Sequence, residues 1–209
     1  MAASVIVLGI KPQMAPELLP GLSAYAGKST LIVSIMAGRT LGFMEREFPK
    51  SSAVVRAMPN LPASIGRGIT VAVANANVTK QKRELAGELL AAAGTVEWVE
   101  QEKLLDAVTA VSGSGPAYVF LLAEALAAAG VASGLPKELA ERLARETIAG
   151  SGELLNRSPL DAATLRQNVT SPGGTTAAAL QVLMGPGGIE TLMATAVAMA
   201  TRRSRELAG

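Results

Sequence analysis

Residues 4–35 read SVIVLGIKPQMAPELLPGLSAYAGKSTLIVSI, and this stretch decides the fold. Two near-continuous apolar runs, Ser4–Ile10 and Thr30–Ile35, are typical of strands that are buried on both faces of a sheet. Between them, Met14–Tyr25 is long enough to form a helix that crosses from one strand to the next. The order strand, helix, strand therefore predicts a parallel sheet with right-handed crossovers.

The same alternation continues through the first hundred residues. Two more apolar runs, Ala53–Met58 and Gly68–Ala74, read as strands, and Arg39–Phe48 reads as a second crossover helix. A further helix and a last short strand follow over residues 78–99. We predict an α/β domain with a parallel sheet over residues 1–100.

From about residue 100 onward the strand pattern disappears, and residues 101–209 are expected to form an all-helical domain. The expected helices are Glu102–Gly113, Pro116–Gly134, Pro136–Leu155, Pro159–Val169, Thr175–Met184 and Ile189–Leu207. Before the fourth of these, Ser158 is expected as the N-cap, Pro159 as the first helical residue and Asp161 as a first-turn acid. Several of these helices are Ala-rich and apolar on more than one face, which predicts a bundle that buries surface against a second chain.

The sequence SGSGPAY at Ser112–Tyr118 invites a comparison with phosphate-binding loops. A dinucleotide-binding fingerprint must follow a strand and open a helix, whereas this run follows a helical pattern. We interpret it as a close corner between two helices, where glycines let the backbones approach each other.

The residue types that are absent restrict the chemistry. The 209 residues include neither cysteine nor histidine. This composition excludes disulfides, thiolate nucleophiles, the Ser-His-Asp triad and nearly every zinc site, so we expect no metal centre. Any catalysis must move protons with hydroxyl groups, lysine, carboxylates, tyrosine or water.

Charge and aromatic content argue against nucleic-acid binding. The net charge is only +2, basic residues are scattered, and aromatic residues make up 3% of the chain. The most apolar run, Ala117–Ala132, carries Glu124 and falls short of the roughly 18 uncharged residues that a membrane span needs. The N-terminal apolar run has no basic leader and no cleavage pattern. We therefore expect a soluble, cytoplasmic protein that binds neither nucleic acid nor membrane.

The carboxyl ends of the predicted strands offer a first candidate site, because ligands of open α/β sheets bind there. The first strand leads into Lys11 and Pro12, the second into Ala37 and Gly38, and the third into Asn60. Taken alone, Lys11 is better explained as a solvated loop lysine. A lysine cation, the small residues Ala37 and Gly38, and an asparagine amide at one edge of the sheet together favour a ligand site.

The second candidate site is the sequence NVTSPGGTTA at Asn168–Ala177, which enters a helix. A helix N-terminus presents unpaired N–H groups and the positive end of its dipole, so it suits a carboxylate or phosphate. The plain alternative is a capped turn, because serine, threonine and glycine all favour N-caps. A cap needs one such residue, whereas seven of these ten positions are Ser, Thr, Gly or Pro. The stretch therefore predicts a site for a small anion.

Five motifs occur in order from the first residues to roughly the last helix. They are VIVLGIKPQ, SIMAG, VRAMPNLPASIGRG, DAVTAVSGSGPAYVF and VTSPGGTTAAAL. On these motifs the sequence resembles the pyrroline-5-carboxylate reductases, the oxidoreductases of the last step of proline biosynthesis. The resemblance implies a partial Rossmann-like dinucleotide-binding domain followed by a helical dimerisation and substrate-binding domain, assembled as a homodimer or a higher homo-oligomer.

The resemblance also implies a reaction and roles for individual residues. A hydride would pass from NADPH or NADH to the C=N carbon of 1-pyrroline-5-carboxylate, which gives L-proline. The residues implied to line the cofactor are Lys11, Pro12, Ala37, Gly38 and Asn60. Those implied to bind the substrate are Val169, Ser171, Gly174 and Thr175, and those implied at the reacting atoms are Asn168 and Thr176.

One departure from the family concerns the N-terminus. In the family, two strand–helix units precede the motif VIVLGIKPQ, and the first carries the Gly-rich turn that binds the pyrophosphate. By the size of such units about 60 residues are missing here, together with the residue that selects NADPH or NADH. We therefore expect an N-terminally truncated member with impaired dinucleotide affinity, whose first strand has an unpaired apolar edge.

Two alternative functions stay open at this point. The chain would act only as a helical dimerisation module that carries a remnant α/β layer, or it would be another imine or keto-acid dehydrogenase of the same superfamily. The first alternative leaves the intact motifs KPQ and NVTSPGGTT unexplained. The second differs from proline formation by its substrate and product.

Overall fold

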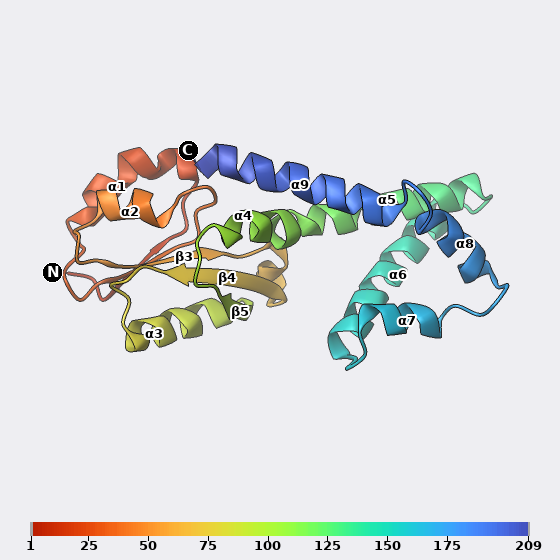
Figure 1. The fold of residues 1–209 in the computed structure, drawn as a ribbon, viewed down its shortest axis with the longest axis horizontal. Coiled ribbons are helices and arrows are strands. Elements are labelled where there is room, and N and C mark those ends of the chain that lie inside the picture. Colours follow the sequence, from red (N-terminus) through yellow and green to blue (C-terminus); the bar gives the residue numbers. More distant parts are fainter. Residues whose placement is uncertain (1, 209) are drawn as a thin grey trace. The chain divides into compact units, whose positions relative to one another are not determined.

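The computed structural model describes residues 2–208 (Figure 1). It consists of two compact units, which we describe separately. The α/β unit comprises the residues up to Pro116 together with those from Val197 onward, and the helical unit comprises Ala117–Ala196. The units divide within a helix, later than the domain boundary that we expected after residue 100. The reason is that Leu105, beyond that boundary, packs against Val71 and Val73 of the sheet.

The α/β unit is built on a five-stranded sheet whose spatial order follows the chain. The strands are β1 (Val5–Leu8), β2 (Leu31–Ser34), β3 (Ala53–Met58), β4 (Gly68–Ala74) and β5 (Gly94–Trp98). The crossover helices are α1 (Ala15–Ser23), α2 (Leu41–Glu47) and α3 (Lys80–Ala91). β1, β2 and β3 are parallel, as are β4 and β5, so the predicted strand–helix alternation is confirmed. Among the described strands β1 pairs only with β2, and its other edge is unpaired, as expected.

The pair β3–β4 differs from the expectation of a parallel sheet throughout. These two strands are antiparallel, with Val55 opposite Ala74 and Met58 opposite Val71. Only residues 59–67 connect them, and a parallel return needs a crossover of about a dozen residues or more. This connection contains a 3-10 turn at Leu61–Ile65 instead. The prediction of parallel strands is therefore wrong for this pair, and the length of the connection explains why.

Helices cover both faces of the sheet, which explains the near-continuous apolar runs (Figure 1). On one face α1 and α2 pack over the strands, and on the other face α3 does so. The buried side chains of the first face include Leu8, Ile32, Val54, Leu19, Met44 and Phe48. Those of the second include Leu31, Val33, Val55, Ala57, Ala72 and Ala86. The alternation of Leu31, Ile32 and Val33 between the faces is the two-residue period of a strand.

The SGSGPAY segment is not the corner that we expected. The chain stays helical from α4 (Leu104–Val108) through a π-helical turn at Thr109–Gly113 into α5 (Gly115–Ala132). The close neighbour of Gly113 is a strand side chain and not a second helix, because a Cβ at Gly113 would lie 2.9 Å from Cε of Met58 on β3. By length and composition the run Leu104–Ala132 would be long and apolar enough to cross a membrane. One such helix is only weak evidence for a membrane span.

The remaining helices are α6 (Lys137–Arg157), α7 (Ala162–Asn168), α8 (Thr175–Leu183) and α9 (Ile189–Ala208). Their existence was predicted from the sequence. Several ends differ by one or two residues, and the start of α7 differs in its capping residue. Asp161 is itself the N-cap, and its Oδ1 accepts a hydrogen bond of 2.7 Å from the Thr164 backbone N–H. The expected cap, Ser158, instead accepts a hydrogen bond from Leu160 N–H in the preceding turn.

The Asp161 cap makes the start of α7 sensitive to pH. Hydrogen bonds donated by Thr164 hold the pKa of the Asp161 carboxyl below its usual value. A lowered folded-state pKa means that the stabilisation is present above the unfolded pKa and is lost as the pH falls through the folded pKa. We expect Asp161→Ala to speed hydrogen exchange of the α7 amides at neutral pH, and the difference from wild type to shrink well below about pH 4. Asp161→Asn keeps a capping oxygen but has no charge, so it is the control. An equal difference in exchange rate between Asp161→Ala and wild type at neutral pH and below about pH 4 would contradict this account.

Candidate functional site

The carboxyl ends of β1, β2 and β3 lie at the same edge of the sheet, because these strands are parallel. This arrangement brings together the loops that carry the first set of predicted site residues. We call Lys11 and Pro12 the first loop, and Ala37 and Gly38 the second loop. Asn60 follows β3 at the same edge.

The first loop turns sharply and leaves its lysine in solvent. Pro12 opens a 3-10 turn, and the Lys11 carbonyl accepts a hydrogen bond of 2.9 Å from Met14 N–H. The Lys11 side chain is exposed. It forms no ion pair with any residue from 2 to 208, so its ammonium group is available to an anionic ligand.

The second loop requires glycine at its second position. Gly38 has φ +69°, and a Cβ there would lie 3.3 Å from the carbonyl oxygen of Leu207. A side chain at this position would therefore be strained both by its backbone conformation and by its neighbour. The adjacent Ala37 is exposed and small, so the second loop is accessible to a ligand at this residue.

Asn60 has a structural role that the sequence did not indicate. Its side-chain oxygen accepts a hydrogen bond of 3.0 Å from Ile69 N–H, and its carbonyl accepts one from Ala63 N–H. These bonds hold the turn that returns the chain to β4. The amide NH2 group is the part of this side chain that remains for a ligand.

An ion pair between a buried arginine and a half-buried glutamate lies next to the second loop, and it was not predicted from the sequence. Arg56 on β3 is 5% exposed, and its Nη1 donates a 2.7 Å hydrogen bond to Oε1 of Glu102. The same oxygen accepts a 2.7 Å hydrogen bond from the backbone N–H of Leu41, the first residue of α2. The pair therefore fixes the start of α2, three residues after Gly38. The charge inside the apolar run AVVRAM is the signal that would have found it.

In the helical unit, the second predicted site is the entrance of α8. Gly174 is the N-cap, and the structure shows no side-chain hydrogen bond to the first-turn N–H groups. The turn before it is closed by main-chain bonds, with Gly174 N–H donating to the Ser171 carbonyl at 3.0 Å. Gly173 has φ +69°. The hydroxyl groups of this segment do not cap the helix, and glycine, one of the cap residues of the plain alternative, takes the N-cap position.

The side chains around this entrance are accessible. Asn168, Val169, Ser171 and Thr175 are exposed, whereas Thr176 is half-buried on the first turn of α8. The neighbouring Thr170 hydroxyl is occupied, because it donates a 2.7 Å hydrogen bond to the Arg166 carbonyl. The geometry leaves open N–H groups and hydroxyl donors around one helix end, an arrangement that suits a small carboxylate.

Within residues 2–208 there is no group of three or more His, Asp or Glu side chains that could hold a metal ion. The donors at both candidate sites are hydroxyl, amide and ammonium groups together with main-chain N–H groups. Such donors recognise anions and polar organic ligands.

The fold and these two sites define a class of protein. It has an α/β domain with a candidate ligand site at the carboxyl edge of its sheet, followed by a helical domain with a candidate anion site at the N-terminus of a helix. The family model "Pyrroline-5-carboxylate reductase dimerisation" matches residues 102–207. A pyrroline-5-carboxylate reductase of Synechocystis sp. is 43% identical over 205 residues, which are 98% of this chain and 75% of that protein. The chain belongs to the pyrroline-5-carboxylate reductase family.

Solved structures agree with this assignment. The pyrroline-5-carboxylate reductase of Coxiella burnetii superimposes with a TM-score of 0.91 at 39% identity, covering 98% of this chain and 76% of that one. The enzyme of Plasmodium falciparum, solved with NADP bound, gives a TM-score of 0.85 at 33% identity, covering 99% of this chain and 78% of that one.

Proposed function

We propose that this protein reduces 1-pyrroline-5-carboxylate to L-proline with a hydride from NADPH or NADH, the last step of proline biosynthesis. The observation that carries the proposal is the entrance of α8, whose first-turn N–H groups have no side-chain cap. Such a helix N-terminus suits a carboxylate ligand, and the chain belongs to a family named for a carboxylate substrate.

The substrate carboxylate would be held at the α8 entrance. The main-chain N–H groups of the first turn and the hydroxyl groups of Ser171 and Thr175 supply the donors, and the helix dipole favours the negative charge. Gly174 supplies backbone to this site, and glycine fits its tight turn because a Cβ there would lie 3.1 Å from the Ser171 carbonyl oxygen. Val169 supplies the apolar contact for the ring.

Reduction adds a hydride to the imine carbon and a proton to the ring nitrogen. NADPH or NADH supplies the hydride when it is bound. Thr176 would place its hydroxyl group beside the imine nitrogen, orient the ring and relay a proton from water to the nitrogen, regaining its own proton from that water. Asn168 would support this arrangement. Catalysis then rests on positioning and on anchoring the carboxylate, which suits a chain without histidine.

The cofactor would be held at the sheet edge of the α/β unit. The two loops fit such a ligand, because they present a free ammonium at Lys11 beside Pro12, and a small exposed residue, Ala37, before the tight turn at Gly38. The amide NH2 group of Asn60 is the third donor at this edge. We expect either reduced nicotinamide cofactor to be accepted.

We place the protein in the cytoplasm as part of the same proposal. The helical unit supports a homodimer or a higher homo-oligomer. Large apolar side chains remain exposed in the single chain, among them Phe120 at 53% and Leu121 at 64%. A hollow of about 1250 Å³ lies against α5 and α6. Its lining combines apolar residues such as Phe120 and Ile148 with charged ones such as Glu124 and Arg145. A second copy would cover this surface, as the name of the matching family model indicates.

The test is to supply the purified chain with 1-pyrroline-5-carboxylate and NADPH or NADH and to measure cofactor oxidation and proline formation. We expect stoichiometric L-proline. A six-membered cyclic imine and a keto acid, offered in parallel, test the alternative of another dehydrogenase. Self-association without any turnover would instead favour the helical dimerisation module.

A further inference from the structure

We infer that Arg39 is a positioning residue for the nicotinamide cofactor, because it clamps the first loop to the second loop. The inference rests on the proposed function, since it assigns to these loops the cofactor that the proposal places there. Arg39 directly follows Gly38 and is half-buried.

The contact between Arg39 and the first loop is a two-pronged hydrogen bond. Nε and Nη2 of Arg39 both donate to the Pro12 carbonyl oxygen, at 3.2 and 2.9 Å. The same oxygen accepts the backbone N–H of Ala15, so it lies at the pivot of the turn that follows Lys11. Among residues 2–208 these are the only side-chain hydrogen bonds that join the stretches around the two loops.

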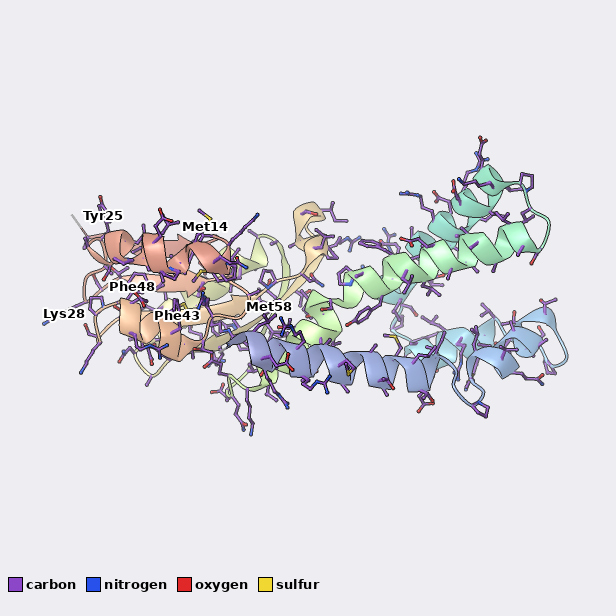
Figure 2. All side chains as sticks on the ribbon, turned by 90° about the horizontal axis from the view of Figure 1, so that it is seen from above. Met14, Tyr25, Lys28, Phe43, Phe48 and Met58 are labelled. Carbon is purple, nitrogen blue, oxygen red and sulfur yellow. The ribbon has the colours of Figure 1, made fainter. Side chains whose placement is uncertain are left out.

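The direction of the Arg39 side chain is fixed by an aromatic ring. Its Cζ atom lies 4.5 Å from the centre of the Phe43 ring on α2, and Phe43 is labelled in Figure 2. Phe43 is itself held, because its backbone N–H donates to Oγ1 of Thr40, the N-cap of α2. The guanidinium group is thus oriented by a ring on one side and bonded to a carbonyl on the other.

This arrangement couples two segments that come from different strand–helix connections. A ligand that touches both loops binds best when their separation is set in advance, because the cost of ordering them has then been met in the free protein. Without Arg39 the two loops would still be connected by the β1–β2 pairing and by the apolar packing beneath them, but the side-chain hydrogen bonds between them would be lost. The clamp therefore acts on cofactor affinity, and it does so without touching the substrate carboxylate.

The experiment compares Arg39→Met with Arg46→Met in the full chain. Arg46 lies over the same Phe43 ring, at 6.0 Å, but donates no bond to the first loop. We expect Arg39→Met to raise the Kd of NADPH or NADH, measured by calorimetry, about tenfold, and Arg46→Met to leave it within about twofold. Arg39→Lys keeps the charge but lacks the two guanidinium donors, so its Kd for the cofactor should fall between those of wild type and Arg39→Met.

Steady-state kinetics give a second readout. The KM for the cofactor should rise in Arg39→Met while the KM for 1-pyrroline-5-carboxylate stays the same, a split that general destabilisation would not produce. Unchanged cofactor Kd in Arg39→Met and Arg39→Lys, or an equal loss in Arg46→Met, would overturn the inference alone. Failure of the wild-type chain to bind either cofactor would overturn the proposed function and this inference with it.

Discussion

Replacement of Glu102 by alanine is expected to lower the free energy of unfolding of the α/β unit by about 3 kcal/mol. The change leaves the Arg56 guanidinium, which is 5% exposed, without its counterion inside the sheet. The backbone N–H of Leu41 loses its acceptor as well, so the start of α2 is weakened together with β3.

The measurement is chemical denaturation, followed by the fluorescence of the single tryptophan, Trp98 on β5. Glu100→Ala is the matched control, because Glu100 pairs with Arg83 at 3.4 Å and its side chain is 83% exposed. This surface pair should contribute less than about 1 kcal/mol. A double change, Arg56→Met with Glu102→Leu, removes both charges and should recover much of the lost stability. Equal losses in Glu102→Ala and Glu100→Ala would contradict the structural role of the buried pair.

The second large effect concerns turnover. Thr176→Val is expected to lower kcat about a hundredfold, because valine matches threonine in shape but has no hydroxyl group to place beside the imine nitrogen. Cofactor affinity should not change, since the proposed cofactor residues belong to other segments of the chain.

Thr195→Val is the control for the Thr176 variant. Thr195 lies on α9, is exposed, and donates its hydroxyl to the Thr191 carbonyl within the same helix. The same chemical change therefore removes only a local helix contact, and kcat should stay near the wild-type value. Wild-type turnover in Thr176→Val would remove Thr176 from the proposed mechanism.

The elements of the fold were predictable because their periodicity is local. β3 and β4 have the bounds that the apolar runs predicted, and the crossover helices fall where the spacing required them. The direction of β4 was not read correctly, because the apolar pattern of a strand is the same in either direction. The length of its connection to β3 carried that information.

Candidate site residues could be proposed from the sequence only where the residue type at a single position restricts its conformation or its chemistry. Gly38 and the glycines of the α8 entrance stand out because few other residues fit such positions. The bonds of Arg39 to Pro12, and of Arg56 to Glu102, join residues 27 and 46 positions apart. A single sequence contains no periodicity that links such partners, so these contacts emerged only from the folded chain.

The most direct test of the central claim follows an isotope. The protein is supplied with 1-pyrroline-5-carboxylate and with NADPH or NADH that carries deuterium at the transferable position, and the product is analysed by nuclear magnetic resonance. The account predicts L-proline with one deuterium on Cδ, the former imine carbon. Proline without the label, or oxidised cofactor without proline, would contradict it.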